Sequence, residues 1–473
     1  MLPPVRSIAA LLAASTALAA CASVPDVGTP ASVRPASAYA TGRSFAAATV
    51  DWPSEAWWTG YGDPQLTALV EEALKDSPSL AAAAARVRRA EALAGQARSA
   101  LQPNLSLSGG ATAIVGAGSG PLAAMAPTAL TGTGYGLLRG GFDLDLWGRN
   151  RASLAAATSE AEAARADAAA TRLSLSTAVA AAYADLAQLY ADREAATQAL
   201  EVRRRTVELL NQRFANGLEN RGGAEQAEAG LAQAEAEIAA LDEAIGLNRN
   251  RIAALLGAGP DRGLSIKPPA PSAIRAFGLP DRLAADLVGR RPDVLAARLR
   301  AEAAVGRTRA AKAAFYPNVN LSVVALGLAP DLGALGASNL ALGAAGPALS
   351  LPIFDGGRLG AQYRAARADH DAAVADYDRA VVEAFHEVAD AAASARALST
   401  RLARSREAVA AAEAAYAVAQ DRYNGGLATY LEVLRAEDLL ISSRRVLAEL
   451  GTRAFSLDIA LVRALGGGFA GRV

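Results

Sequence analysis

The chain has 473 residues, of which 52% are hydrophobic and only 5% aromatic, and its 47 lysines and arginines balance 47 aspartates and glutamates. The balanced charge excludes the strong basic field of a nucleic-acid-binding surface, so no nucleic acid is expected as a partner. The single cysteine excludes an intrachain disulfide.

The first residues have the polarity of a secretory signal. Arg6 precedes an uncharged apolar stretch over residues 8–20, and this order predicts a signal peptide over residues 1–20. The LAAC sequence that ends at Cys21 resembles the lipobox of bacterial lipoproteins, which implies that Cys21 carries a lipid and becomes the mature N-terminus. An ordinary signal peptide with an incidental cysteine is the alternative. Residues 21–50 are rich in Ser, Pro, Ala and Thr without periodicity, which predicts a lipid-anchored tether.

An aromatic cluster follows the tether. Trp52, Trp57, Trp58 and Tyr61 lie close together before Pro64. Such a cluster could form a ligand platform, but it is more typical of a packing site that fixes a loose N-terminal segment. We therefore predict that these side chains are buried.

Two stretches make the same transition from an alternating apolar run to a helical pattern. The first is FDLDLWGRNR over residues 142–151, and the second is LSLPIFDGGRLGAQYRAA over residues 349–366. Their glycines align at one offset, because 357 − 148 = 209. Glycine supplies the backbone conformations that a sharp turn requires. The sequence therefore predicts two strand-to-helix turns, formed around Gly148, Arg149, Gly356 and Gly357.

Each turn leads into a long helix. Apolar residues recur every seven positions in both copies, which predicts helices over residues 149–214 and 359–423, each about 100 Å long. A glycine-containing breaker ends each helix, and a second helix follows in both copies at the same offset. One structural unit is therefore used twice.

The repeat divides the chain into six segments. We predict a signal peptide, a tether, a first repeat, a proline-rich linker, a second repeat and a C-terminal tail, over residues 1–20, 21–50, 51–257, 258–291, 292–467 and 468–473.

Each repeat contains two candidate strands whose residues alternate between apolar and polar. In NVNLSV, over residues 318–323, the apolar side chains share one face, and residues 104–108, 142–146 and 349–353 follow the same pattern. A half-buried sheet in a soluble protein would look alike, but nothing else in the chain offers a layer to cover this one. A sheet in lipid must close on itself, and known barrels begin at about eight strands. Four strands per chain thus predict an oligomer, and a trimer would supply about twelve strands.

The combined features resemble the TolC-like outer membrane factor family, and in particular the lipoprotein subgroup that serves resistance-nodulation-division (RND) pumps. The signatures FYPNVNLS, LSLPIFDGGR and RYNGGLATYLEVLRAED carry this resemblance. It implies a mainly helical chain with a membrane β portion, in which a trimeric twelve-stranded outer membrane β-barrel is continued by a twelve-helix periplasmic α-barrel. It further implies that the linker over residues 258–291 lies in an equatorial region.

The resemblance also implies a function. The chain would be an outer membrane channel that passively exports small toxic compounds or drugs, without enzymatic activity or a cofactor. Its partners would be two further copies of itself, a periplasmic adaptor, an inner membrane RND-type pump and outer membrane lipid. Its location would be the bacterial outer membrane, anchored by lipid and extending into the periplasm.

In this family the turns between helices form the periplasmic aperture. Members often place a ring of carboxylates there, and the matching position is Glu432. Three copies around an axis would attract cations, although a solvated acid at a helix start is the alternative. Tyr423 ends the packed seam at the same aperture, and packing is its expected role. The sequence departs from the family at Arg435, where a second acid is common, and at Ala428, where some members have a gating arginine.

Three other functions fit the sequence less well. A type I secretion duct for proteins would share the fold. A periplasmic adaptor would also have a lipobox, but adaptors have one helical hairpin and this chain has two. An enzyme on a helical scaffold would require a polar constellation, whereas the two histidines, His370 and His386, are too few for a metal site without a cysteine partner.

Overall fold

The computed structural model describes residues 24–114, 131–270, 277–329 and 340–471. Contacts divide the chain into two compact units. Unit 1 comprises residues 1–33, 87–164 and 297–377, and unit 2 comprises residues 34–86, 165–296 and 378–473.

The elements confirm the internal repeat. The paired helices have equal lengths, and the two members of each pair lie at the offsets predicted from the sequence. They are α3 (Pro78–Ser99) and α8 (Pro292–Ala313), with 22 residues each and starts 292 − 78 = 214 apart; α4 (Arg149–Ala215) and α9 (Arg358–Asn424), with 67 each and starts 358 − 149 = 209 apart; and α5 (Arg221–Leu255) and α10 (Tyr430–Ala464), with 35 each and starts 430 − 221 = 209 apart.

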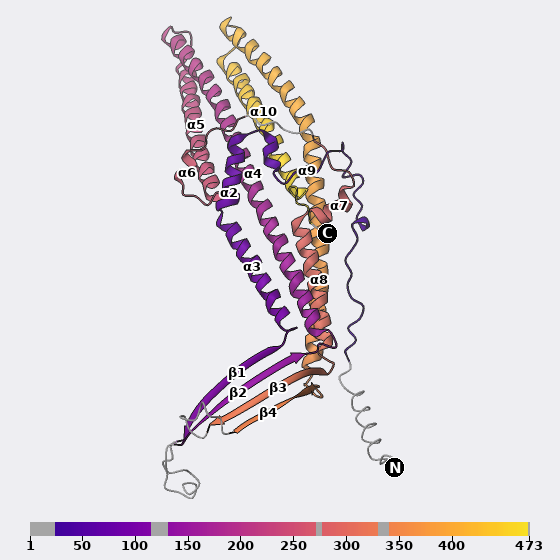
Figure 1. Ribbon diagram of the computed structural model, residues 1–473. Helices are drawn as coiled ribbons and strands as arrows, with labels where there is room; N and C mark the ends of the chain where they lie inside the picture. The colour runs from indigo at the N-terminus through magenta and orange to yellow at the C-terminus, as the bar shows by residue number, and fades with distance from the viewer. Residues whose placement is uncertain (1–23, 115–130, 271–276, 330–339, 472–473) are drawn as a thin grey trace, which may run out of the picture. The chain divides into compact units, whose positions relative to one another are not determined.

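Unit 1 contains one antiparallel sheet, in which the strands lie side by side in chain order (Figure 1). Its strands are β1 (Asn104–Ile114), β2 (Thr131–Asp143), β3 (Asn318–Ala329) and β4 (Leu340–Ser350). Leu107 lies opposite Leu138 on one face, and Ser106 lies opposite Arg139 on the other. Leu105 and Leu107 are 70% and 77% exposed. The sheet thus presents an exposed apolar face, and β1 and β4 are its unpaired edges in the part of the chain that the structure describes.

Two of the predicted strands were placed too far along the chain. The alternation predicts strands over residues 142–146 and 349–353, but β2 ends at Asp143 and β4 ends at Ser350. Asp145 has a left-handed φ of 46°, which ends strand geometry. The β3–β4 ladder ends where Ser350 pairs with Asn318, the first residue of β3. The apolar residues beyond these strand ends belong to the turns.

The predicted aromatic packing site is confirmed in unit 2 for three of its four residues, whereas Trp52 is only half-buried, with the Arg290 guanidinium 4.7 Å from its ring centroid. Trp57, Trp58 and Tyr61 lie on the 3₁₀ helix η2 (Trp57–Tyr61) and are buried. They pack with α2 (Pro64–Asp76) and with residues of α4, α5 and α10 in the largest core cluster of the unit. The edge of the Tyr61 ring contacts Phe455 of α10, with 4.8 Å between ring centroids. This cluster fixes the start of the first repeat.

Residues 24–50, predicted as a tether, contact α9 at several points within each unit. In unit 1, the backbone N–H of Ala31 donates to Asp371 over 3.1 Å. In unit 2, Arg34 pairs with Asp378, and Tyr39 packs edge-on against Phe385. This part of the segment includes one short 3₁₀ helix, η1 (Ala36–Ala38). The α9 partners recur every seven residues at 371, 378 and 385, so one stripe of the helix holds the segment.

The linker and the C-terminal segment of unit 2 are closely packed. The linker contains α6 (Asp261–Leu264) and α7 (Leu283–Arg290). After α10, Gly466 and Gly467 have positive φ angles, and a Cβ on Gly466 would lie 2.1 Å from the carbonyl oxygen of Arg290. Only glycine satisfies both constraints here. Among the described residues, none of the helices combines the length and the apolar character that crossing a membrane would need.

Candidate functional site

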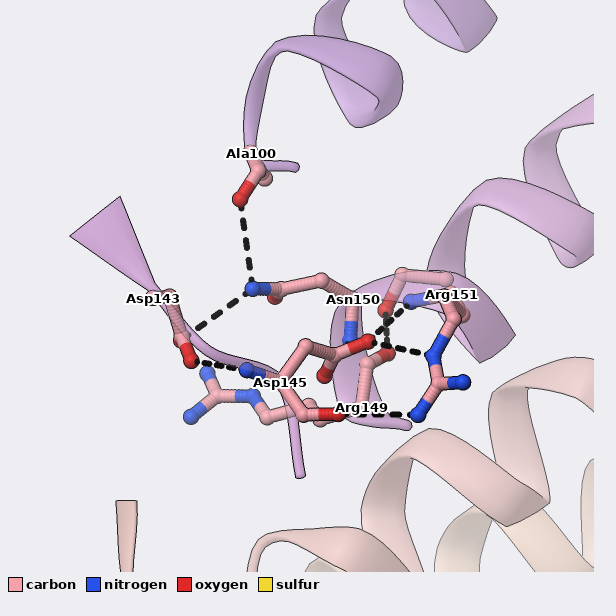
Figure 2. A network of polar contacts seen from close by, with 7 residues as sticks. Ala100, Asp143, Asp145, Arg149, Asn150 and Arg151 are labelled. Atoms are coloured by element: carbon pink, nitrogen blue, oxygen red, sulfur yellow. Dashed lines mark hydrogen bonds and ion pairs between the residues drawn. The ribbon is translucent and has the colours of Figure 1, made fainter. Parts of the chain in front are cut away.

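The first strand-to-helix turn is organised by Asp145 (Figure 2). Its buried carboxylate accepts hydrogen bonds from the backbone N–H groups of Asn150 (2.8 Å) and Arg151 (3.0 Å), and it forms an ion pair with Arg151 Nε (3.1 Å). Burial alone would raise the pKa of Asp145, but these hydrogen bonds and the Arg151 charge hold it below its usual value. Asp145 therefore caps α4 as a carboxylate.

Asp143 and Asn150 tie this turn to the end of the preceding helix. The Asp143 carboxylate accepts from the Asp145 N–H (2.8 Å) and from the Asn150 side-chain amide (3.1 Å). The same amide donates to the carbonyl oxygen of Ala100, just beyond α3 (Figure 2). The predicted turn residues lie within this network, where Gly148 has a φ of 72° and Arg149 begins α4.

The second strand-to-helix turn is also capped by an aspartate, Asp355. Asp355 accepts hydrogen bonds from the backbone N–H groups of Gly357 (2.9 Å) and Leu359 (2.7 Å) at the start of α9. Gly356 and Gly357 both have positive φ angles, as the turn prediction requires. Sequence reasoning identified the glycines and missed both capping aspartates. An aspartate shortly before a helix start was the available signal.

At the other end of the long helices, Tyr423 joins the two hairpins of unit 2. Its side chain is buried, and its hydroxyl donates to Glu219 in the α4–α5 turn over 2.8 Å. The Arg213 guanidinium lies 4.3 Å from the ring centroid. Burial and the neighbouring Glu219 carboxylate raise the pKa of Tyr423 to about 12, so the hydroxyl remains a donor at neutral pH. Tyr423 thus packs, as expected, and also makes a polar link that the sequence did not predict.

Glu432 has a different partner. It lies in the first turn of α10, is half exposed, and forms an ion pair with Arg422 over 3.7 Å. The two predicted aperture residues therefore contact different groups, Glu432 pairing with Arg422 and Tyr423 with Glu219.

A buried carboxylate lies further along α10. Glu437 is fully buried, forms an ion pair with Arg203 of α4 over 3.2 Å, and accepts a hydrogen bond from Thr206 over 3.1 Å. Arg203 also pairs with the half-exposed Asp438. Burial raises the pKa of Glu437, and Arg203 and Thr206 offset this only in part. Nothing in the sequence distinguished this acid from its exposed neighbours.

The described residues contain no group of three or more His, Cys, Asp and Glu side chains placed to hold a metal ion. Cys21, the predicted lipid attachment site, lies outside the described residues. The polar groups described above cap helices and join them.

Comparisons with known proteins give one consistent result. A family model described as outer membrane efflux protein matches residues 69–258 and 283–467. The fusaric acid resistance protein FusA of Burkholderia cepacia is 41% identical over 372 residues, which cover 76% of this chain and 69% of FusA. The multidrug resistance outer membrane protein MdtP of Shigella flexneri is 30% identical over 441 residues, covering 89% and 88% of the two chains. The crystal structure of the outer membrane protein VceC of Vibrio cholerae has a TM-score of 0.81 at 46% identity, covering 88% of this chain and all of VceC.

Glu437 makes stability depend on pH. Because its pKa is raised in the folded state, the protonated form is favoured on folding, and this contribution grows as pH falls from the raised pKa to the unfolded value near 4.5. The quantity to compare is the free energy of unfolding of the wild type minus that of Glu437→Gln. We expect this difference to increase by about 1.4 kcal/mol for each unit by which the pH falls within this window. Urea unfolding in detergent at a series of pH values measures the difference. A difference that stays constant, or that falls on acidification, would contradict the assignment.

Proposed function

The chain belongs to the outer membrane efflux protein family, and we propose that it is the outer membrane channel subunit of a tripartite efflux system. The solved structure of VceC, matched over its whole length, agrees with the predicted fold class of a mainly helical outer membrane protein with a small sheet. Relatives named for resistance to fusaric acid and to multiple drugs support small toxic compounds as the exported class. The chain conducts them passively and catalyses no reaction.

The open four-stranded sheet carries this proposal. Among the described residues its strands pair only with one another, and the apolar side chains of one face, such as Leu105 and Leu107, are largely exposed. Hydrocarbon leaves the backbone groups of an open edge without partners, so a sheet in lipid must close. Three copies close it with about twelve strands, which lies within the known range for barrels.

The helical hairpins supply the periplasmic part of the duct. Each chain contributes the hairpins α4–α5 and α9–α10, so a homotrimer has enough long helices for a twelve-helix barrel. The hairpin turns over residues 216–220 and 425–429 form the end that faces the inner membrane. A periplasmic adaptor docks there and connects the duct to an RND-type pump, which supplies the energy.

A lipid on Cys21 anchors each chain beside the sheet. Pro25 lies against the first turn of α9, where a Cβ on Gly360 would be 3.5 Å from Pro25 Cγ. The four residues from Cys21 to Pro25 reach at most about 14 Å, so the lipid enters the membrane close to the strand ends.

Mass spectrometry of the mature N-terminus tests the anchor. We expect a lipid-modified Cys21 as the first residue, and an unmodified N-terminus would contradict it.

Conductance tests the duct and its aperture together. We propose that Glu432 lines the periplasmic aperture and that Tyr423 packs at the same end of the hairpins. Three Glu432 carboxylates would favour cations even with Arg422 nearby. The wild type is expected to conduct in planar bilayers with cation selectivity, and Glu432→Gln to reduce that selectivity severalfold. Glu407→Gln removes another exposed, arginine-paired acid and serves as the control. Unchanged cation selectivity in Glu432→Gln would contradict the proposed ring of carboxylates. A wild type that does not conduct would contradict the proposed channel function.

A further inference from the structure

A basic groove lies between α4 and α8 at the sheet end of unit 1. Its volume is about 560 Å³, and its charged lining residues are Arg151, Arg309 and Lys312, with no carboxylate among the lining side chains. Trp147 and Tyr316 close the end nearest the strands. We propose that this groove binds the phosphate headgroup of an anionic phospholipid in the periplasmic leaflet of the outer membrane.

Two of the three cations of the groove are available for a ligand. Arg309 and Lys312 are exposed, and within the described ranges neither side chain has a hydrogen bond or an ion pair. Arg151 is committed to Asp145, which it holds through Nε over 3.1 Å. Two unpaired cations on one helix, one turn apart, suit a phosphate bearing a negative charge.

The aromatic end of the groove is typical of a membrane interface. The rings of Trp147 and Tyr316 stack with 4.8 Å between centroids, yet Trp147 is 52% exposed. The Trp147 indole N–H donates to the carbonyl oxygen of Pro317, directly before β3. Tryptophan and tyrosine favour the headgroup level, where one part of the ring is apolar and another is wet. The stack therefore places the groove at headgroup height once the strands cross the membrane.

The contacts among α4, α8 and α9 define the direction in which the groove opens. Gly306 of α8 packs against Ala156 of α4, and the Thr308 hydroxyl donates to Ala366 of α9. Helix α8 therefore lies between α4 and α9. At about 100° per residue, Arg309 and Lys312 project from α8 on one side of the line through these three helices.

The N-terminal segment lies on that same side. Helix α8 runs towards the sheet and α9 away from it (Figure 1), so their side chains rotate in opposite senses when both are viewed from the sheet. Two positions of α9, Gly360 and Asp371, contact the N-terminal segment. Ala366 faces α8, and at about 100° per residue both positions project from α9 to one side of it. That side is the one that Arg309 and Lys312 occupy on α8. The segment that leads to the lipid anchor lies outside the duct. The groove therefore opens outwards, towards lipid, and away from the lumen.

This inference rests on the proposed function, because only a sheet that crosses the outer membrane brings the groove to a lipid headgroup. A neighbouring copy is the other candidate occupant. The groove lies between two helices of one chain, however, and a second copy would join the sheet at its open edges, β1 and β4.

Lipid binding to the purified full-length protein in detergent tests the site. Native mass spectrometry with added phosphatidylglycerol or phosphatidylcholine reports the affinity of each lipid. We expect the wild type to prefer phosphatidylglycerol, and the double variant Arg309→Gln/Lys312→Gln to bind it roughly 10- to 30-fold more weakly, from about 1 kcal/mol for each cation near an anionic headgroup. The phosphatidylcholine affinity should not change.

The matched control is Arg298→Gln/Arg404→Gln, which removes two exposed arginines that lie elsewhere on α8 and α9 and are paired with Glu302 and Glu407. It should retain the preference for phosphatidylglycerol. Equal binding of both lipids by the wild type, or an unchanged preference in the groove variant, would overturn the lipid site. Both variants should still form the oligomer and conduct. Loss of conduction in the wild type would instead overturn the proposed function.

Discussion

An open sheet edge in hydrocarbon leaves backbone N–H and C=O groups without partners, and each such group costs several kcal/mol. The described part of one chain provides four strands with two open edges and an exposed apolar face. The other features become intelligible once these edges must be paired with further copies. The turns at Asp145 and Asp355 set the direction in which helices leave the strands, because each aspartate fixes the first turn of a long helix.

The far ends of the same helices are held by buried polar contacts. Tyr423 joins the α9–α10 hairpin to the α4–α5 turn through Glu219, and Glu437 joins α10 to α4 through Arg203. Buried ion pairs add little net stability, since desolvation offsets much of their attraction, but breaking one leaves an uncompensated charge. Such contacts therefore favour one packing of the two hairpins over others. This property suits the proposed aperture at this end of the hairpins.

The sequence was sufficient to predict the bounds of the long helices, but it did not predict where the strands end or which polar side chains pair. The repeat fixed the long helices to within one residue, because a seven-residue seam sustained over many turns has few alternative registers. The strand ends at Leu146 and Ile353 were wrong, because the alternation continues into the turns. The left-handed Asp145 follows the end of β2, and the β3–β4 ladder ends where Ser350 pairs with the first residue of β3. Periodicity cannot detect a single residue that leaves strand geometry.

Among the residues of the candidate sites, some could be predicted from the sequence and others could not. Gly148 and Gly357 could be found because a sharp turn demands their positive φ angles. Glu219, Arg203 and Glu437 could not, because their roles depend on which helices become neighbours. Arg309 and Lys312 look like ordinary surface residues until the fold brings them beside Trp147, which lies more than 150 residues earlier in the chain.

Closure of the sheet by three copies is the central claim, and the oligomeric state of the Cys21→Ser chain tests it most directly. This variant lacks the proposed lipid anchor, so only the closed sheet would keep it in the outer membrane. Light scattering and circular dichroism on the detergent-extracted protein should show a stable trimer that is mostly helical, with a minor strand signal. A monomer recovered from the soluble fraction would contradict the barrel.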